Sequence, residues 1–554
     1  MVWGRLFVAS ALALSASVFV TAQGSEAANG ANWRICKTEW SAEDERGFGE
    51  FVRVIGESGC NSSIDCLRSP ANPFLGDDPA ALRVFADCAD WPYALRAYYA
   101  WKIGLPFRYV NGVSGSAGDL RFSSTANQPR SKRDIVDHGQ PPRGSTILDE
   151  IRNTVSTATY RTDAGVEGSV LSDFYSPKLA PGSIRAGTVI YDVHGHVAIV
   201  FKIDEDGRIH YMDAHPDLTV TRSVYGAQFG QSPARLGGGF KNWRPVRLVG
   251  ATERADGSYA GGRIVATPHS EIADYSLEQY HGNVPGTRGD GRDAQFAYND
   301  IPLKLIEYVR ASVSGGNMSY NPVFELRATM RTLCNDLKDR SLFVNIAIDA
   351  GIHRKAQPAR LPDNIYGTAI WEWELYSTPS RDARIKTAFA AFHEDLGRMI
   401  EMWRQRNKRI VYDGLFLDKD LQDMYAEESA ACAMTYRNSM GTPVTLNFDQ
   451  MAKRIFTMSF DPYHCIERRW GASDPAELAS CADSDTKQRW YLAEQRLRNQ
   501  IDRTYDARMD HSVAELEQRP RGSGVDSPPP VEVSHLISNV GYRVEFQGMS
   551  PVGR

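Results

Sequence analysis

The sequence predicts an α+β protein in which a helix packs on an antiparallel sheet and a mostly α-helical C-terminal domain follows. An apolar, β-branched run, residues 197–203, and a second strand candidate, residues 208–214, flank an Asp-Glu-Asp-Gly turn, a pattern typical of a β-hairpin. Residues 93–102 are rich in alanine, leucine and aromatic residues and contain no breaker, which predicts a helix. From about residue 270 onward, apolar residues recur at helical spacing between many charges.

The predicted helix carries a cysteine at its start. Asp87 and Asp90 both offer N-cap chemistry, and Pro92 is tolerated only in a first turn, so the first helical residue is expected near Asp90 or Trp91. Cys88 is then pre-helical or on the first turn, where free N–H groups and the helix dipole favour a thiolate. The sequence therefore predicts Cys88 as a nucleophile.

The predicted hairpin carries a candidate general base. His196 begins its first strand, and a turn centred on residues 204–207 brings it close to Asp213 or His215 near the end of the second strand. Asp213 and His215 share one face because side chains alternate along a strand. A carboxylate or second imidazole beside a histidine fixes the ring tautomer and raises its basicity.

These segments resemble the NlpC/P60 and CHAP cysteine peptidases and amidases, which share a papain-like core. Asp87-Cys88, a helix and then Gly104-Leu105-Pro106 are similar to NlpC/P60, and the string Gly195-His196-Val197-Ala198-Ile199-Val200 is similar to CHAP. The resemblance covers residues 80–250. It implies Cys88 as nucleophile, His196 as base, and Asp213 as the orienting third residue, with His215 as the substitute.

The chain departs from the family in two places. Ala89-Asp90-Trp91-Pro92 follows the cysteine, where the family has a small residue and glycine. Residues 108–183 form an insertion, which is expected to be either a lid or substrate-selecting loop, or a disordered surface excursion. Trp91 and His194 are the candidate substrate-binding residues. His210 is expected to be a surface or packing residue.

The resemblance implies amide hydrolysis through a thioester, with the backbone N–H of Cys88 as an oxyanion donor. For an exported bacterial member it implies a peptidoglycan stem-peptide amide or another peptide as substrate, and no cofactor. Two other classes stay open. An acyltransferase or deamidase on the same fold would show an apolar cleft lined by Trp91, Tyr98, Trp101 or the insertion. A catalytically silent exported protein would act by interaction through its helical region.

The N-terminus predicts export. Arg5 precedes an apolar stretch, residues 6–20, and Val20-Thr21-Ala22 fits a cleavage site, so residues 1–22 are expected to be a signal peptide cleaved after Ala22 and the mature protein to be periplasmic or secreted. No other apolar run reaches about 18 residues, which argues against a further membrane span. A net charge of −5 gives no reason to expect nucleic acid as a partner. The oligomeric state is left open.

The cysteine count supports the same picture. With Cys88 kept as a free nucleophile, seven of the eight cysteines remain, an odd number. Pairings Cys60–Cys66 and Cys465–Cys481 are expected across short loops, and Cys334–Cys432 would then tie the C-terminal region, although Cys36 could displace any partner. A bridged or structural Cys88 is the alternative. No Cys-x-x-Cys pair or tight Cys/His cluster argues for zinc, so no metal is expected.

The predicted domain organisation has four parts after the signal. Residues 30–250 form the papain-like domain, 251–269 a linker, 270–516 the helical domain and 517–554 a proline-rich tail. Basic residues on the last helix are expected to form a solvated face, or alternatively to bind a polymer. The helices expected after residue 270 span residues 301–313, 322–338, 381–405, 418–436, 448–458 and 485–516.

Overall fold

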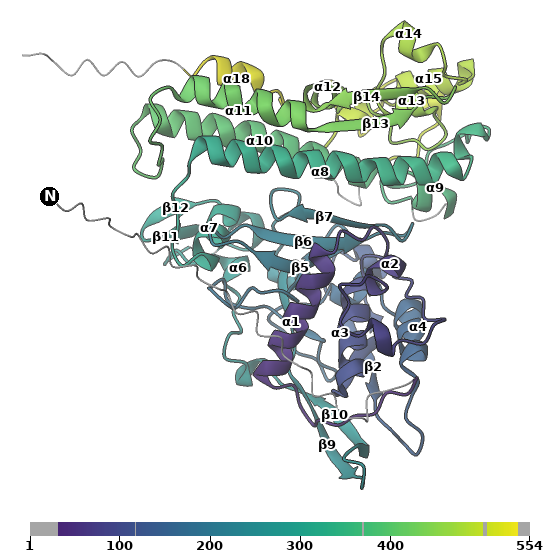
Figure 1. The fold of residues 1–554 in the computed structure, drawn as a ribbon, viewed down its shortest axis with the longest axis vertical. Helices are drawn as coiled ribbons and strands as arrows, with labels where there is room; N and C mark the ends of the chain where they lie inside the picture. Colours follow the sequence, from purple (N-terminus) through teal and green to yellow (C-terminus); the bar gives the residue numbers. More distant parts are fainter. Residues whose placement is uncertain (1–30, 117, 288, 368–370, 502–506, 541–554) are drawn as a thin grey trace, which may run out of the picture.

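The computed structural model describes residues 31–540, apart from 117, 288, 368–370 and 502–506. A mixed α/β part carries a stack of long helices on one side (Figure 1). The expected signal peptide lies outside the described residues. Within the described ranges, no helix is long and apolar enough to cross a membrane.

A six-stranded antiparallel sheet forms the centre of the α/β part, in the order β3-β8-β4-β5-β6-β7. The predicted hairpin is its β5–β6 pair, with Ile199 opposite Met212 and a register shift between Val200 and Lys202. The strands are β3 (Phe174–Tyr175), β4 (Val189–Asp192), β5 (His196–Ile203), β6 (Ile209–Ala214), β7 (Val220–Val224) and β8 (Gly239–Trp243).

The two faces of this sheet bury different cores. Val197 and Ile199 share a core with α1 (Ala42–Glu57) and α3 (Asp90–Ile103). Ala198 and Val200 point to the other face, where they pack with α7 (Leu305–Val313). The predicted combination of a helix packed on an antiparallel sheet is therefore present.

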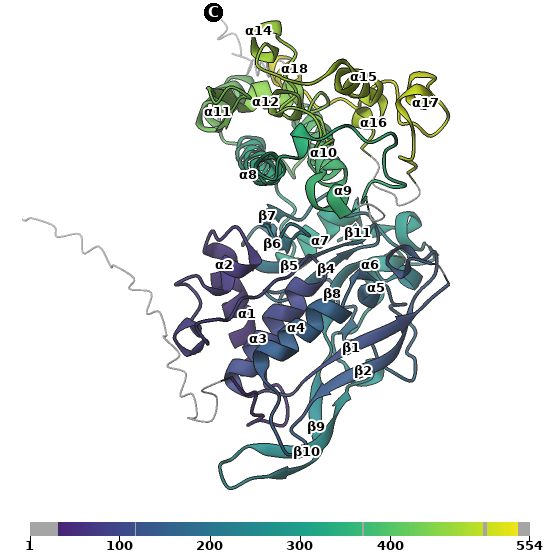
Figure 2. The same ribbon diagram turned by 90° about the vertical axis from the view of Figure 1, so that its right-hand side faces the viewer.

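The insertion is ordered over its described residues, so the expectation of a disordered excursion is not met there. Its elements are β1 (Phe107–Ser114), η3 (Leu120–Phe122), β2 (Gln128–Ile135), α4 (Gly144–Thr154), α5 (Thr157–Tyr160) and β3. β1 and β2 form an antiparallel hairpin, and α4 packs against α3 on the side away from the sheet (Figure 2).

The prediction of a linker over residues 251–269 is wrong. Most of it belongs to a hairpin of β9 (Val246–Glu253) and β10 (Tyr259–Ala266), which contacts β2 and projects from the α/β part. Its polar composition reflects a two-stranded ribbon with little burial. Gly261 and Gly262 take positive φ angles of 70° and 80°, which a side chain would disfavour.

The helical domain begins at residue 322 rather than at 270. Residues 270–313 instead pack on the sheet through α6 (Glu278–His281), β11 (Phe296–Tyr298), β12 (Ile301–Leu303) and α7. The expected helix over residues 301–313 loses its first residues to β12, which pairs with β11. Pro322 occupies the first turn of α8 (Pro322–Asp349) after the N-cap Asn321, which explains this boundary.

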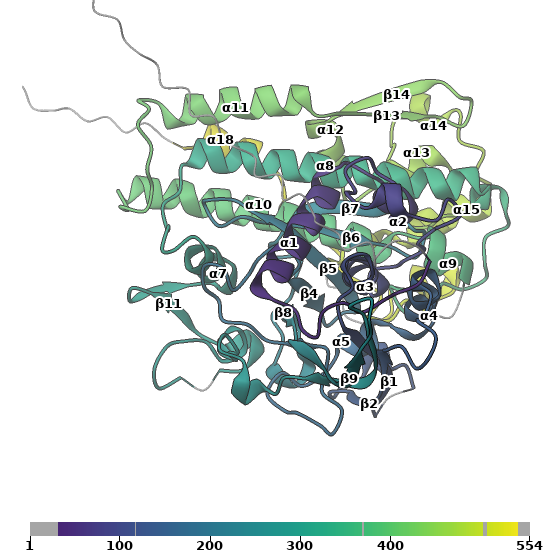
Figure 3. The same cartoon turned by 60° about the horizontal axis from the view of Figure 1, so that its bottom comes forward.

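Three long helices, α8, α10 (Pro379–Arg404) and α11 (Leu417–Ala431), form the body of the helical domain (Figure 3). The helix expected over residues 418–436 stops at Ala431, where Cys432 enters a disulfide and β13 follows. The remaining elements are α2 (Ser63–Leu67), α9 (Trp371–Tyr376), β13 (Ala433–Arg437), β14 (Pro443–Asn447), α12 (Phe448–Arg454), α13 (Ile466–Arg469) and α14 (Pro475–Leu478).

The C-terminal region differs from its expected form. The single helix expected over residues 485–516 is divided into α15 (Asp485–Ala493), α16 (Gln495–Asn499) and α17 (Val513–Glu517). The expected tail is not simply a tail, because Val531, Val533 and Ile537 are buried in the core of the helical domain, around α18 (Ser534–Ser538).

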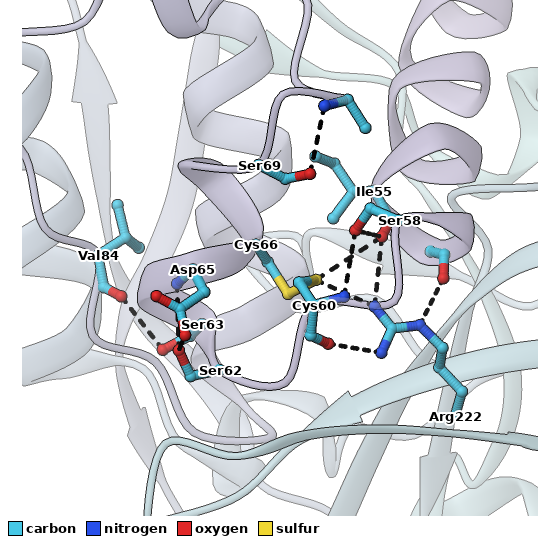
Figure 4. Close-up of a disulfide and its surroundings, with 12 residues drawn as sticks. Ile55, Ser58, Cys60, Ser62, Ser63, Asp65, Cys66, Ser69, Val84 and Arg222 are labelled. Atoms are coloured by element: carbon cyan, nitrogen blue, oxygen red, sulfur yellow. Dashed lines mark hydrogen bonds between the residues drawn. A yellow bond between two sulfur atoms is a disulfide. The ribbon is translucent and has the colours of Figure 1, made fainter. Parts of the chain in front are cut away.

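The structure contains the three expected disulfides, Cys60–Cys66, Cys334–Cys432 and Cys465–Cys481. Arg222 on β7 braces the first of them: its guanidinium donates to the carbonyl oxygens of Gly56 and Cys60 (Figure 4). Because Gly56 lies in the last turn of α1, the arginine also balances the negative end of that helix.

Candidate active site

Cys88 lies directly before α3. The helix begins at Asp90, as expected, and the Asp87 carboxylate caps it by accepting hydrogen bonds from the N–H groups of Ala89, at 2.9 Å, and Asp90, at 3.2 Å. Cys88 takes part in none of the disulfides and keeps its thiol. The bridged alternative for this cysteine is thereby excluded.

The thiol lies along the first residues of β5. Cys88 Sγ is 4.0 Å from the carbonyl oxygen of Gly195, and the N–H of Val197 donates a hydrogen bond to the sulfur. The thiol therefore contacts the backbone of the residues before and after His196. This contact joins two parts of the chain that are 107 residues apart.

The environment of the thiol differs from the sequence-based expectation. Burial, followed by the charge of Asp87, raises the pKa of Cys88, although the Val197 N–H and the charge of Arg384 act in the opposite direction. The expected helix-terminus effect is weak because Asp87 already occupies the N–H groups that would stabilise a thiolate. The protonated thiol is the resting form.

His196 is held by the predicted aspartate. Its Nε2 lies 2.6 Å from Asp213 Oδ2, and both side chains are buried. The hydroxyl of Thr221 donates to the other oxygen, Asp213 Oδ1. An Nε2–H donated to the carboxylate leaves the lone pair on Nδ1, so Nδ1 is the ring nitrogen that could accept a proton.

Charges and burial set the state of this pair. Burial, then the charge of Arg384, lowers the pKa of His196 to about 4, while the hydrogen bond that the ring donates to Asp213 opposes the shift. Burial alone would raise the pKa of Asp213, but its interactions with His215 and His196 and the charge of Arg384 outweigh that effect, and the pKa lies well below its usual range. A neutral imidazole beside an ionised carboxylate is the result.

His215 does not replace Asp213 as the partner of His196. The two imidazole rings are stacked, with centroids 5.6 Å apart, and His215 Nε2 is 3.0 Å from Thr221 Oγ1 and 3.7 Å from Asp213 Oδ2. His215 thus reaches Asp213 mainly through the threonine hydroxyl. Of the two predicted alternatives for the third residue, Asp213 makes the direct contact.

The register of the sheet fixes how thiol and ring approach. His196 pairs with Asp192 on β4, and alternation directs both side chains, with Asp213, to the face opposite α3. Cys88 approaches from the α3 side. The sulfur therefore contacts the backbone on either side of His196 at the start of β5, where the β5–β6 pairing has ended.

The two predicted substrate-binding residues lie in different surroundings. Trp91 has no exposed surface and packs in the core, so it does not line a cleft, and the prediction for it is wrong. Tyr98 and Trp101 are likewise buried, so these residues form no apolar cleft. His194 is partly exposed in the turn before β5, where its N–H donates to Asp192 Oδ1 at 3.0 Å.

His210 has the position expected from its parity. Its ring is partly exposed, and Nε2 lies 2.7 Å from Asp204 Oδ2 in the turn between β5 and β6. It takes no part in the network of His196.

The insertion and the helical domain meet beside Gly195, whose carbonyl oxygen contacts the thiol. The ring of Phe122 lies so close to Gly195 that a Cβ at Gly195 would come 2.6 Å from its Cε1, and Gly195 also has a positive φ of 86°. Phe122 stacks on Tyr366 with centroids 5.0 Å apart, and Arg121 forms an ion pair with Glu374 at 3.5 Å. The sequence did not identify these residues, because each pair joins segments about 250 positions apart.

The helical domain also places arginines near Asp213 and His215. Arg381 and Arg384 of α10 line a cavity together with Asp213 and His215. Their recurrence three residues apart, among the apolar positions of a predicted helix, was the one available signal that they face inward.

A second group of titratable residues lies elsewhere, inside the helical domain. Asp461, His464 and Glu494 have side-chain ligand atoms within 4.8 Å of one another. Both ring nitrogens of His464 are already engaged, Nδ1 with Ser459 Oγ at 2.7 Å and Nε2 with the Lys487 carbonyl at 3.1 Å. Burial and then the charge of Asp461 raise the pKa of Glu494 well above its usual range, so the group fits a neutral buried network better than a cation site.

Comparison with known proteins gives no relative for this chain: no family model, no curated protein and no solved structure matches it. The assignment of the site therefore depends on its own chemistry.

Proposed function

We propose that the protein is an exported cysteine hydrolase that cleaves an amide bond with Cys88, His196 and Asp213. The observation that carries the proposal is the convergence of a thiol, an imidazole and a carboxylate at one end of the sheet: the thiol lies on the backbone around His196, and His196 is bonded to Asp213. This combination suits acyl transfer through a thioester.

The chemistry follows from the protonation states. His196 Nδ1 takes the proton of the Cys88 thiol as the sulfur attacks the amide carbonyl carbon. His196 then gives that proton to the leaving amine as the carbon–nitrogen bond breaks, which leaves a thioester. Water attacks the thioester, again with His196 as base, and the acid product leaves the thiol. The backbone N–H of Cys88 is the proposed oxyanion donor.

Asp213 orients the ring throughout this cycle. Its carboxylate holds Nε2–H and stabilises the imidazolium that forms transiently. The bond from Thr221 limits rotation of that carboxylate.

The proposed substrate class is a peptide amide of the cell-wall stem peptides. It depends on the resemblance to the NlpC/P60 and CHAP families and on export. Three disulfides are compatible with an oxidising compartment.

A catalytically silent interaction protein is the second candidate. The raised pKa of Cys88 favours it, because a low thiolate fraction slows attack.

Hydrolysis of dye-labelled sacculi separates the two candidates. The wild type is expected to release dye, and Cys88→Ala, His196→Gln and Asp213→Asn to lose most of that release. The control is Cys36→Ala, which removes a cysteine that is in none of the disulfides. Equal release by the wild type and Cys88→Ala would disprove the hydrolase and support the interaction protein.

A further inference from the structure

The loop closed by the Cys60–Cys66 disulfide contacts the segment that leads to the candidate nucleophile. Ser63 in this loop has no exposed surface. Its hydroxyl donates a hydrogen bond to the carbonyl oxygen of Val84 at 3.1 Å (Figure 4) and accepts one from the N–H of Ala86 at 3.2 Å. Ala86 is two residues before Cys88, so this one side chain fixes the chain just ahead of the thiol.

The same residue also contacts the turn that leads into β7. The N–H of Ser63 donates to the carbonyl oxygen of Leu218 at 3.0 Å. Three residues later, the hydroxyl of Thr221 donates to the Asp213 carboxylate. Ser63 is thus bonded both to the segment before the nucleophile and to the turn before the residue that holds Asp213.

Two further contacts hold the disulfide loop and β7 together. The N–H of Val220 donates to the carbonyl oxygen of Asn61 at 2.9 Å, and Arg222 Nη1 donates to the carbonyl oxygen of Cys60 at 2.7 Å. Arg222 Nη2 also lies 3.0 Å from Cys60 Sγ (Figure 4). Because these bonds lie on both sides of Thr221 and the disulfide restricts the loop, the loop and the strand are held in one arrangement.

We propose that Ser63 is a positioning residue of the candidate active site. By joining the segment before Cys88 to the turn before Thr221, it sets where the thiol lies relative to the His196–Asp213 pair. This inference rests on the proposed function. It gives the disulfide loop a role in the site in addition to its contribution to stability.

Ser63→Ala removes the two side-chain bonds and leaves the backbone bond to Leu218 in place. It is expected to lower kcat on a soluble stem-peptide amide about tenfold and to change KM by less than about twofold, because a displaced reacting group slows the chemical step more than it weakens binding. The second readout is a cross-link made by dibromoacetone, which alkylates a thiol and then a nearby imidazole. The fraction of alkylated Cys88 that becomes linked to His196, measured by peptide mapping, should fall about threefold for the same reason.

The matched control is Ser459→Ala in the helical domain. Ser459 is also fully buried, donates to His464 Nδ1 at 2.7 Å and accepts from the N–H of Asp461 at 3.1 Å. Its loss should lower the urea midpoint as Ser63→Ala does, but should leave kcat and the cross-linked fraction unchanged. A role of Ser63 limited to stability would instead give the two variants the same result.

Cys60→Ser combined with Cys66→Ser tests the same point without a change at Ser63. It opens the loop, so kcat and the cross-linked fraction are expected to fall here too. Circular dichroism shows which variants are folded, and the combined variant decides the question if Ser63→Ala does not fold.

Wild-type values of kcat and of the cross-linked fraction in every folded variant of the loop would overturn the inference, even in a protein that hydrolyses the amide. A wild type that neither hydrolyses the amide nor links Cys88 to His196 would overturn it as well. A wild type that forms the link without hydrolysis would remove only the hydrolase, and a lower cross-linked fraction in Ser63→Ala would then still support the positioning role.

Discussion

Arg381 on α10 and Asp217, two residues beyond His215, form an ion pair with 2.6 Å between Nη1 and Oδ2. The two side chains are 7% and 2% exposed, so the pair is buried between the domains. This ion pair holds the helical domain against the loop that follows Asp213 and His215. Removal of one partner would leave an uncompensated buried charge.

Asp217→Asn should therefore lower the free energy of unfolding by about 3 kcal/mol. Urea denaturation of both proteins at neutral pH measures the change. Glu394→Gln is the control, because its pair with Lys304 also joins the domains but both side chains are more than half exposed, and it should cost at most about 1 kcal/mol. Equal losses in the two variants would contradict a stabilising role for the buried pair.

The contact of the Cys88 thiol with the backbone on both sides of His196, together with the proposed catalytic role of that histidine, predicts a chemical cross-link. Dibromoacetone, which alkylates a thiol and then a nearby imidazole, should join Cys88 to His196. Peptide mapping of the treated protein identifies the linked residues. A link from Cys88 to His194, or no link at all, would show that Nδ1 of His196 is not accessible from the thiol.

The buried neutral state of His196 predicts a pH dependence of stability. Its pKa is about 4 in the folded protein and 6.5 in the unfolded chain, so the unfolded chain binds the proton first as the pH falls. The contribution of His196 to stability should therefore be constant above about pH 6.5 and become increasingly unfavourable toward pH 4.

His196→Gln should remove about 3 kcal/mol of that decline, as two and a half pKa units imply. Chemical denaturation of wild type and variant across this pH range measures it. His215 contributes a decline of the same sign, because burial lowers its pKa as well, so only the difference between the proteins reports His196. His210→Gln, on the partly exposed ring paired with Asp204, serves as the control and should keep the wild-type decline.

Phe122 and Tyr366 predict restricted access to the thiol. Phe122→Ala and Tyr366→Ala should increase the rate at which a bulky polyethylene-glycol maleimide labels Cys88 by about tenfold, with a smaller effect on iodoacetamide, because the stacked rings cover the approach beside Gly195. Gel-shift assays follow the labelling. Met440→Ala removes an exposed apolar side chain far from this contact and should have no effect. If the bulky reagent labels the wild type as fast as the variants, the rings do not restrict access.

Local sequence patterns were sufficient for much of the fold. The β5–β6 hairpin, the start of α3 at Asp90 and the Cys60–Cys66 and Cys465–Cys481 cystines depend on nearby residues, and all are present. The Cys334–Cys432 cystine followed by elimination and is also present. The predictions failed where tertiary pairing overrides composition. Residues 251–269 look like a linker because the β9–β10 hairpin buries little, and Trp91 was placed in a cleft although its helix is buried on every side.

The candidate site was predictable only in part, for the same reason. The partnership of His196 with Asp213 followed from alternation along one hairpin. The charge at Arg384, the rings of Phe122 and Tyr366, and the capture of the α3 N–H groups by Asp87 depend on distant segments or on a competing hydrogen bond. A single sequence gives no spacing rule for such contacts.

Only residues 314–321 connect α7 of the α/β part to α8 of the helical domain, and no cystine joins the two sides of that connection: Cys60–Cys66 lies before it, and Cys334–Cys432 and Cys465–Cys481 lie after it. The disulfides of each half can therefore form independently of the other half. The two halves then need only non-covalent association, so a protease cut within this connection would leave a nicked but assembled heterodimer rather than two covalently tethered fragments.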